Sequence, residues 1–501
     1  MQALLTREQA REVDRVAVDD FGVESLVLME NAGRGAADAI VARFPDRLDR
    51  VVLVGGPGQN GGDAWVVARR LALIGWRPLA VFVGDLSRLR GDAAPNWKLL
   101  EKLSVGTQVI RPEHTDELAA LLAQATLVVD GLFGTGLDRP VEGGYAAAVR
   151  AMDEAAAPVV SLDLPSGLDA NTGAVLGVAP RAALTVTFAG LKRGLHQYPG
   201  VDHAGEVEVA DIGVPSRHPP ETAVYAASDL SRLIAPRQGD AHKGTNGHVL
   251  IVGGSPGKTG AALLAGRAAF RSGAGLVTLG ARADARAALE EKVVELMTTE
   301  LVDAPTQSAV EALCEGKRSA VLGPGLGLDP LGAAWTDAFV RYAPVPVVVD
   351  ADAITNLGSG FDVLTEARGP RILTPHPGEA ARLLGSSTRE VQSDRYAAAE
   401  EVAARTGHTI ILKGARSIVA SAGRLGVCSE GTPALGVAGT GDVLSGVAAT
   451  LAVALNPFEA AIGATLLHAL AGREATVGDR GLLASEVADA VPAVLARFVG
   501  R

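Results

Sequence analysis

The chain has 501 residues, of which 48% are hydrophobic and 21% charged, and its formal net charge is −11. These values are typical of globular proteins, and the length suits two domains better than one. An acidic chain with only 4% aromatic residues is a poor candidate for sequence-independent nucleic-acid binding, which needs basic surfaces and stacking platforms. Glycine is in excess, with 60 residues, and has no three-residue period, which excludes collagen.

Two cysteines, Cys314 and Cys428, lie far apart with no Cys-x-x-Cys motif, which predicts a reducing compartment and excludes a disulfide scaffold. Residues 1–15 contain no apolar signal core. The uncharged run Val443–Phe458 contains Asn456-Pro457 and is shorter than the ~20 apolar residues that span a bilayer. We therefore expect a cytoplasmic protein that has no membrane or nucleic-acid partner.

Helix and strand patterns alternate along the chain. A helix from about Arg7 to Phe21 precedes the first strand. Apolar runs typical of buried strands lie at 51–54, 79–83, 126–129 and 158–162, with helical patterns such as 64–73 and 116–123 between them. The same rhythm returns at 249–252, 275–279, 320–322, 345–349, 371–373 and 409–412. Such alternation predicts an α/β fold with parallel sheets covered on both faces.

Prolines interrupt this rhythm near the middle of the chain. The segment Pro215–Pro220 continues neither helix nor strand, and a second proline-containing stretch follows at Pro236–Lys243. We place a boundary there, with one domain over residues 1–219 and another over residues 220–501. Each part is long enough to bury its own core.

Polar residues cluster after three strands of the first half. A glycine-rich turn, residues 55–63, opens a helix and matches Gly-x-Gly-x-x-Gly, but the acidic residue of a dinucleotide fingerprint is missing at the next strand end. Asp130 and Asp163 each end a buried strand, where open α/β sheets hold ligands. Either aspartate alone could equally cap a turn, but two in equivalent positions favour a shared site. Oxygens of Asn60, Asp130 and Ser166 would suit a hard cation, and one carboxylate could serve as acid–base.

A second set of candidate residues lies in the other half. Gly439-Thr-Gly-Asp442 opens an uncharged helix, Val443–Leu455, and free N–H groups at a helix start bind phosphate oxygens. Asp442 could merely cap this helix, or it could deprotonate a hydroxyl beside a phosphoryl donor. Lys413 follows a buried strand in a chain that has few lysines, and two prolines hold His376. His-Glu-x-x-His, Gly-x-Ser-x-Gly and P-loop motifs are all absent from the sequence.

Taken together, these motifs resemble the bifunctional NAD(P)H-hydrate repair enzymes, in which an NAD(P)HX epimerase is fused to an ADP- or ATP-dependent NAD(P)HX dehydratase. The resemblance covers nearly the whole chain. In the first half it rests on the segments Gly58–Asp63, Asp130–Leu137, Asp163–Gly167 and Thr187–Lys192. In the second half it rests on His242–Gly244, Gly253–Gly257, Gly260-Ala261, Gly323–Gly327, Thr374–Glu379, Lys413–Ala415 and Gly439–Asp442.

The resemblance implies a Rossmann-like first domain and a ribokinase-like second domain. It implies that potassium (K+) is held by Asn60, Asp130 and Ser166. The residues implied to face the substrate in the epimerase half are Gln59, Asn60, Gly61, Gly62, Asp63, Gly134, Thr135, Gly136, Leu137, Asp138, Arg139, Pro140 and Asp163. In the dehydratase half the same substrate would contact Ala261, Gly325, His376 and Asp442. The ADP or ATP, accompanied by Mg²⁺, would contact Lys413, Gly414, Ala415, Arg416, Ser417 and Gly441.

The implied ligands are NADHX or NADPHX and ADP or ATP, and neither choice is decided by the sequence. We expect Asp442 to deprotonate the added hydroxyl so that it attacks the terminal phosphoryl group, and Asp163 to interconvert the two epimers. The family usually has Asn at Gln59 and Gly at Ala64, and we expect both departures to be tolerated. A ribokinase-like small-molecule kinase with an accessory ligand-binding domain, or a non-catalytic binding module, are the alternatives. A homo-oligomer is also expected.

Overall fold

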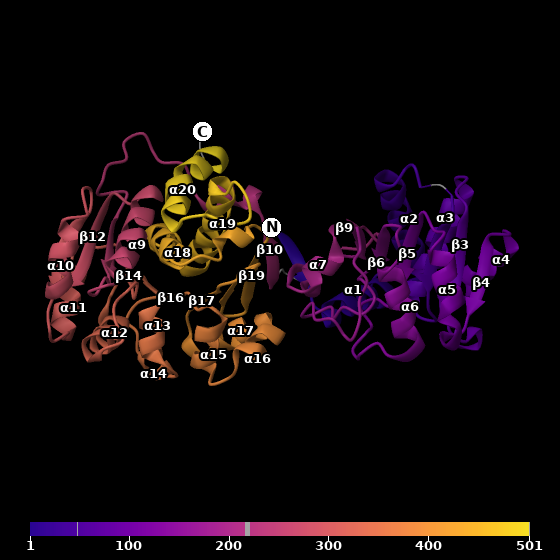
Figure 1. Ribbon diagram of the computed structural model, residues 1–501, viewed down its shortest axis with the longest axis horizontal. Helices are drawn as coiled ribbons and strands as arrows, with labels where there is room; N and C mark the ends of the chain where they lie inside the picture. The colour runs from indigo at the N-terminus through magenta and orange to yellow at the C-terminus, as the bar shows by residue number, and fades with distance from the viewer. Residues whose placement is uncertain (48, 216–220, 500–501) are drawn as a thin grey trace. The chain divides into compact units, whose positions relative to one another are not determined.

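The computed structural model describes residues 1–47, 49–215 and 221–499. Contacts within the chain divide it into two compact units, Gln2–Pro220 and Glu221–Arg501, and Met1 belongs with the second (Figure 1). The expected boundary at residues 219–220 lies outside the described residues.

The N-terminal unit is built on a seven-stranded, wholly parallel sheet in the order β4-β3-β2-β5-β6-β7-β9. A separate short pair joins β1 to β8. The strands are β1 Gln2–Leu5, β2 Val51–Gly55, β3 Pro78–Val83, β4 Gly106–Ile110, β5 Leu127–Gly131, β6 Val159–Leu162, β7 Leu184–Phe188, β8 Leu191–Lys192 and β9 Glu206–Ala210. The helices are α1 Arg7–Asp19, α2 Ser25–Arg43, α3 Gln59–Leu73, α4 Ala93–Lys102, α5 Thr115–Leu122, α6 Gly143–Asp153 and α7 Gly200–Ala204.

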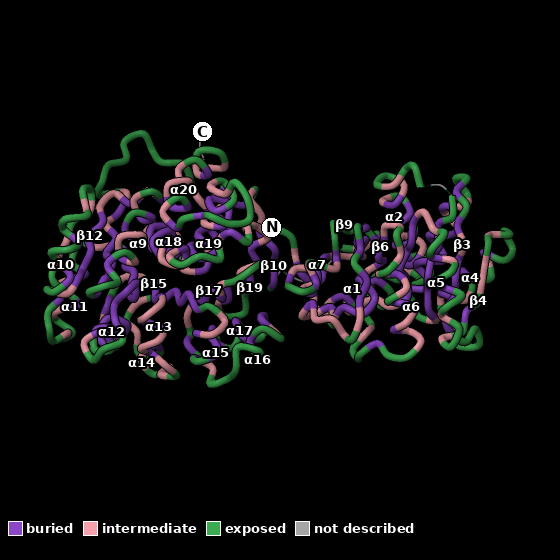
Figure 2. The backbone as a smooth tube through the Cα atoms, viewed as in Figure 1, coloured by how far each residue is buried: buried purple, intermediate pink, exposed green. Residues whose placement is uncertain are grey.

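Alternate side chains of the central strands enter two separate cores. Val51 and Leu53 of β2 pack with α2, α3 and α4, whereas Val52 and Val54 pack with α5 and α6. Figure 2 shows these strands as almost continuously buried. Because both faces of the sheet are covered, its strands have no polar face, and this accounts for their continuous apolar sequence.

Helix α1 lies before the first strand of the large sheet and has its own start signal. Thr6 and Gln9 form a reciprocal capping box, which satisfies backbone N–H groups at the helix N-terminus. Ala10, Val13 and Ala17 form its buried stripe. The helix ends at Asp19, two residues before the predicted end at Phe21.

The C-terminal unit contains a mostly parallel sheet in the order β13-β12-β11-β14-β15-β16-β17-β18-β19-β10. Only the pairs β17–β18 and β18–β19 within this order are antiparallel. The strands are β10 Thr222–Tyr225, β11 His248–Val252, β12 Leu276–Arg282, β13 Met297–Leu301, β14 Ser319–Leu322, β15 Val347–Val349, β16 Arg371–Leu373, β17 Thr409–Leu412, β18 Ile418–Ser421 and β19 Arg424–Cys428.

Helices cover both faces of this second sheet (Figure 1). On one face α9 Thr259–Arg271, α18 Thr440–Leu451, α19 Pro457–Ala475 and α20 Ala484–Phe498 form the largest apolar core with β11, β12, β14 and β17. The remaining helices are α8 Leu230–Leu233, α10 Ala283–Glu290, α11 Gln307–Cys314, α12 Pro330–Tyr342, α13 Asp352–Leu357, α14 Phe361–Thr365, α15 Pro377–Leu384, α16 Thr388–Ser393 and α17 Arg395–Thr406.

The predicted alternation of strands and helices is confirmed, but several strands are missing from the prediction, some at the sheet edges and some inside the sheets, such as β7, β18 and β19. Strands β4 and β9 border the first sheet and β13 borders the second; most positions of each strand are polar or exposed, so none forms the apolar run that marks a central strand. Helix α18 also begins three residues before the predicted start at Val443, because Gly439 supplies its N-cap. In the part of the chain that the structure describes, no helix is both long and apolar enough to cross a bilayer.

Two candidate active sites

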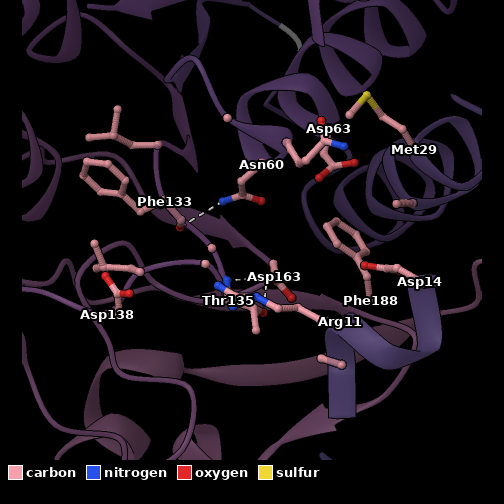
Figure 3. Close-up of a pocket in the computed structure, with 18 of the residues that line it drawn as sticks. Arg11, Asp14, Met29, Asn60, Asp63, Phe133, Thr135, Asp138, Asp163 and Phe188 are labelled. Carbon is pink, nitrogen blue, oxygen red and sulfur yellow. Dashed lines mark hydrogen bonds between the residues drawn. The ribbon is translucent and has the colours of Figure 1, made fainter. Parts of the chain in front are cut away.

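A cavity of about 960 Å³ opens in the N-terminal unit at the carboxyl ends of its central strands (Figure 3). Most residues predicted to face a substrate line it: Gln59, Asn60, Asp63, Gly134, Thr135, Gly136, Leu137, Asp138, Arg139, Pro140 and Asp163. Gly61 and Gly62 instead lie buried within α3. A Cβ on Gly61 would lie 2.1 Å from the carbonyl oxygen of Gly56, so this glycine permits the helix to begin tightly against the preceding turn.

The three predicted cation ligands lie together beside this cavity. The Asp130 carboxylate is fully buried and accepts hydrogen bonds from the Ser166 hydroxyl at 2.5 Å and the Ser166 backbone N–H at 2.8 Å. The Asn60 amide donates to the carbonyl oxygens of Phe133 at 2.9 Å and Leu162 at 3.1 Å. Its own oxygen, Oδ1, is buried and has no hydrogen-bond partner. An orphaned amide oxygen beside a carboxylate and a hydroxyl fits an oxygen-coordinated cation.

Asp163 is held by partners on both carboxylate oxygens. Its Oδ1 lies 2.6 Å from the Lys192 ammonium, and its Oδ2 accepts from the Thr135 backbone N–H at 2.7 Å and from the Thr135 hydroxyl. Its φ of 63° lies in the left-handed region, which aspartate tolerates better than most residues. Burial would raise the pKa of Asp163, but Lys192 and Thr135 outweigh it and lower that pKa. Asp163 is therefore an anion that is fixed in orientation.

Two further carboxyl groups line the same cavity and differ from Asp163 in their proton occupancy. Burial, with repulsion from Asp163, raises the pKa of Asp63 well above its usual range. Burial also raises the pKa of Asp14 to about 6, despite the nearby positive charge of Lys192. Asp14 and Lys192 were not among the predicted site residues. Lys192 ends a segment that carries the family resemblance, whereas no sequence signal marks Asp14.

The second site is assembled at the carboxyl ends of β15, β16 and β17. Asp350 follows β15, His376 follows β16, and Lys413 follows β17. Gly439, with a φ of 91°, begins α18 and leaves Asp442 in the first turn of that helix. A Cβ on Gly441 would lie 3.4 Å from Lys413 Nζ and 3.9 Å from Asp350 Oδ2, so the helix start and the strand ends meet here. Free N–H groups at this position suit the oxygens of a phosphate.

Lys413 turns inward instead of toward solvent. Its ammonium lies 2.8 Å from Asp350 Oδ1 and 3.9 Å from Glu379 Oε2. Burial opposes its charge, but these carboxylates raise the pKa of Lys413 above its ordinary value. Burial and the charge of Asp350 raise the pKa of Asp442 to about 7, against the opposing attraction of Lys413. Asp442 can therefore gain or lose a proton near neutral pH.

His376 caps a helix and still leaves one ring nitrogen for other partners. Its Nδ1 accepts from the backbone N–H groups of Gly378 at 3.0 Å and Glu379 at 3.3 Å, at the start of α15. In the neutral ring the proton then resides on Nε2, which lies 3.6 Å from Glu379 Oε1. His376 therefore caps α15 and at the same time presents an exposed imidazole edge.

The other residues predicted for the second site lie on α9 and on turns. Ala261 is in the first turn of α9, and Gly325, with a φ of 61°, is in the turn after β14. Gly414, Ala415, Arg416 and Ser417 connect β17 to β18. A Cβ on Gly414 would lie 2.8 Å from the guanidinium of Arg395, which also donates to the carbonyl oxygens of Leu412 and Lys413.

These features define an α/β enzyme with two sites, one built on a cavity with fixed carboxylates and one on an anion-binding helix start. The second unit has the predicted ribokinase-like fold. The solved structure of a ribokinase-like superfamily protein from Enterococcus faecalis aligns with 57% of this chain and with 100% of the Enterococcus chain, at 24% sequence identity and a TM-score of 0.50.

Two family models match the chain, one described as NAD(P)H-hydrate dehydratase over residues 249–492 and one as YjeF-related protein N-terminus over residues 25–194. The bifunctional NAD(P)H-hydrate repair enzyme Nnr of Moorella thermoacetica is 38% identical, over 98% of this chain and 96% of that protein. Its namesake in Escherichia coli is 34% identical, over 96% of this chain and 91% of that protein. The chain therefore belongs to the family of bifunctional NAD(P)H-hydrate repair enzymes, and the family resemblance is confirmed.

Proposed function

We propose that the chain repairs hydrated NADH and NADPH in two steps. An epimerase domain over residues 1–219 interconverts the R and S epimers, and a dehydratase domain over residues 220–501 returns the S epimer to the reduced nucleotide at the expense of ADP or ATP. The observation that carries this proposal is the coexistence on one chain of a fixed carboxylate in a large cavity, Asp163, and a carboxyl that titrates near neutrality at a helix start, Asp442.

In the dehydratase step Asp442 takes the proton of the added hydroxyl, whose oxygen attacks the terminal phosphoryl group of the nucleotide. The N–H groups at residues 439–441 stabilise the developing negative charge. The phosphorylated oxygen then leaves as inorganic phosphate, and the neighbouring ring carbon loses a proton to restore the double bond. Lys413 and the turn at 414–417 are proposed to contact the nucleotide, with Ala261, Gly325 and His376 on the hydrated ring. Mg²⁺, held chiefly by phosphate oxygens, would lower their charge repulsion.

In the epimerase step Asp163 faces the substrate as an oriented anion and acts as acid–base. Potassium would be held by Asn60 Oδ1, Asp130 and Ser166, and would supply a fixed positive charge that orders the loop carrying Phe133. The nucleotide phosphates are negatively charged, and Arg11, Arg88 and Arg139 on the cavity wall complement them. Gln59 and Asp63 would complete the contacts to the substrate.

The test supplies pure R or pure S epimer, with and without ADP or ATP, and follows the recovery of absorbance by the reduced ring. With ADP or ATP present, the wild-type enzyme should convert both epimers to the reduced nucleotide. Asp163→Ala should convert only the S epimer, and Asp442→Asn should convert neither epimer. Asp442→Asn should still bind nucleotide, because the N–H groups at 439–441 remain. A stable phosphorylated product in place of inorganic phosphate would instead establish the small-molecule kinase.

We also propose a cytoplasmic location and a homo-oligomer. Cys314 and Cys428 are both free and buried, which suits a reducing compartment. Sedimentation of the purified chain measures the number of subunits, and a monomer at working concentrations would contradict the second proposal.

A further inference from the structure

The N-terminal helix α1 forms one wall of the epimerase cavity, although the family model begins only at residue 25. Arg7 holds the helix in place: its guanidinium donates to the carbonyl oxygens of Thr135 at 3.0 Å and Leu137 at 2.6 Å, and to Asp169 at 2.6 Å. Thr135 is also the residue that donates to Asp163. Helix α1 is thus fastened to the loop that orients the fixed anion, and it presents Arg11 and Asp14 to the cavity (Figure 3).

Several charged groups from different elements face Asp14. Asp63 comes from α3, Asp163 follows β6, Lys192 ends β8, and Arg11 lies one turn earlier on α1. Among the carboxyls, Asp163 has a lowered pKa, Asp14 one of about 6, and Asp63 one well above its usual range. One cavity therefore holds a carboxylate with a lowered pKa beside two carboxyls with raised pKa values.

We propose that Asp14 is the general acid of the epimerase and acts on the opposite side of the substrate ring from Asp163. This proposal rests on the epimerase function proposed above. Water added to a ring double bond beside nitrogen places the hydroxyl on the carbon next to that nitrogen, because the nitrogen lone pair stabilises positive charge there. Inversion at that carbon needs a protonated acid and an ionised base on opposite faces, as in inverting glycoside hydrolysis.

The step balances without any further reagent. The Asp14 carboxyl gives its proton to the ring hydroxyl, the carbon–oxygen bond breaks, and water leaves while the nitrogen lone pair forms a carbon–nitrogen double bond. A water molecule adds to the other face, the new carbon–oxygen bond forms, and its proton passes to Asp163. The ring cation lies near the Asp163 anion throughout. Proton exchange with solvent then resets the two carboxyls, and the reverse reaction uses them in exchanged roles.

Asp14 suits this role better than the other groups that carry protons. Lys192 is only 2% exposed and its ammonium is occupied by Asp163, by the Thr187 hydroxyl at 2.8 Å and by the Phe188 carbonyl oxygen at 2.7 Å. Asp63 is 8% exposed, and a carboxyl with a strongly raised pKa holds its proton too tightly to be an efficient acid. Asp14 lines the cavity from α1, and its pKa of about 6 is low enough for the carboxyl to release its proton, as an efficient general acid requires.

The experiment compares Asp14→Asn, Asp14→Glu and the matched control Asp19→Asn in the full chain. Asp19 lies on the same helix outside the cavity lining and loses the same charge. Asp14→Asn should slow conversion of R to S epimer about 10²- to 10⁴-fold, the range for loss of a general acid. Asp14→Glu should recover part of the rate, and Asp19→Asn should match wild type. Dehydration of pure S epimer and the melting temperature should be unchanged in all three.

The pH profile and the fate of oxygen separate catalysis from binding. Because Asp14 must be protonated, wild-type kcat for epimerisation should fall as pH rises through about 6 or above, and Asp14→Asn should lack this limb. In ¹⁸O-water each inversion should place one labelled oxygen on the ring. A normal kcat with only a raised KM in Asp14→Asn, or inversion without label, overturns the proposal. Absence of epimerisation by wild-type enzyme would instead contradict the proposed function itself.

Discussion

Replacing Gly134 with alanine should slow the epimerase through a single methyl group. A Cβ at this position would lie 2.8 Å from Asp163 Oδ2 and 3.2 Å from Asn60 Cγ, well inside the ~3.5 Å at which non-bonded atoms attract best. Gly134 does not occupy the left-handed backbone region, so alanine introduces no strain of its own. Relief of the overlap requires Asp163 or the loop to move by roughly 0.5–1 Å. Displacements of about 1 Å cost about a hundredfold in rate.

The expected result is a fall of about ten- to a hundredfold in conversion of the R epimer, with dehydration of the S epimer unchanged. The overpacked loop should lose about 1–3 kcal/mol of unfolding free energy in the N-terminal unit. Gly136→Ala is the matched control for the loss of unfolding free energy, because a Cβ there would meet no protein atom within 4 Å. Coupled assays starting from each pure epimer measure both steps on one preparation. A wild-type rate for Gly134→Ala, or an equal loss of unfolding free energy for Gly136→Ala, would contradict this prediction.

Three further predictions concern charge and the cation. Dehydratase kcat should rise with pH through about 7 and then level, because Asp442 must lose its proton to act as base; a flat profile from pH 5 to 9 would contradict this. Lys413→Met removes the positive charge that favours ionised Asp442, and should therefore move the rise in dehydratase kcat to higher pH. Lys413→Arg keeps the charge and should move this rise less. Asn60→Ala should raise the potassium concentration that gives half of the maximal epimerase rate roughly tenfold, because the change weakens the metal site. An unchanged potassium dependence would show that Asn60 is not a potassium ligand.

Much of the fold followed from local sequence. Buried strands such as Val51–Gly55 are continuous apolar runs because helices cover both faces of their sheet. The apolar run is visible in the sequence, so the strand can be predicted from it. The edge strands β4, β9 and β13 are missing from the prediction because polar and exposed residues interrupt their apolar pattern. The interior strands β7, β18 and β19 are missing as well. Predicted helix ends differ from the observed ones by up to five residues, as at Gln59, because helix starts such as the one at Gly439 lie outside the apolar pattern.

The sequence pattern places Asp130, Asp163, His376 and Lys413 after buried strands and Asn60 and Asp442 at helix starts. It therefore predicts that Asn60, Asp130 and Asp163 meet at one sheet edge and His376, Lys413 and Asp442 at another. The chemical state of these groups depends instead on contacts that form only in the folded chain. Asp163 is an anion because Lys192 and Thr135 reach it from other strands and loops, and Lys413 turns inward because Asp350 is buried beneath it. Asp14 joins the cavity from α1, although it lies far from Asp163 in the sequence. Protonation depends on burial and on neighbouring charge, and neither is encoded in a local pattern.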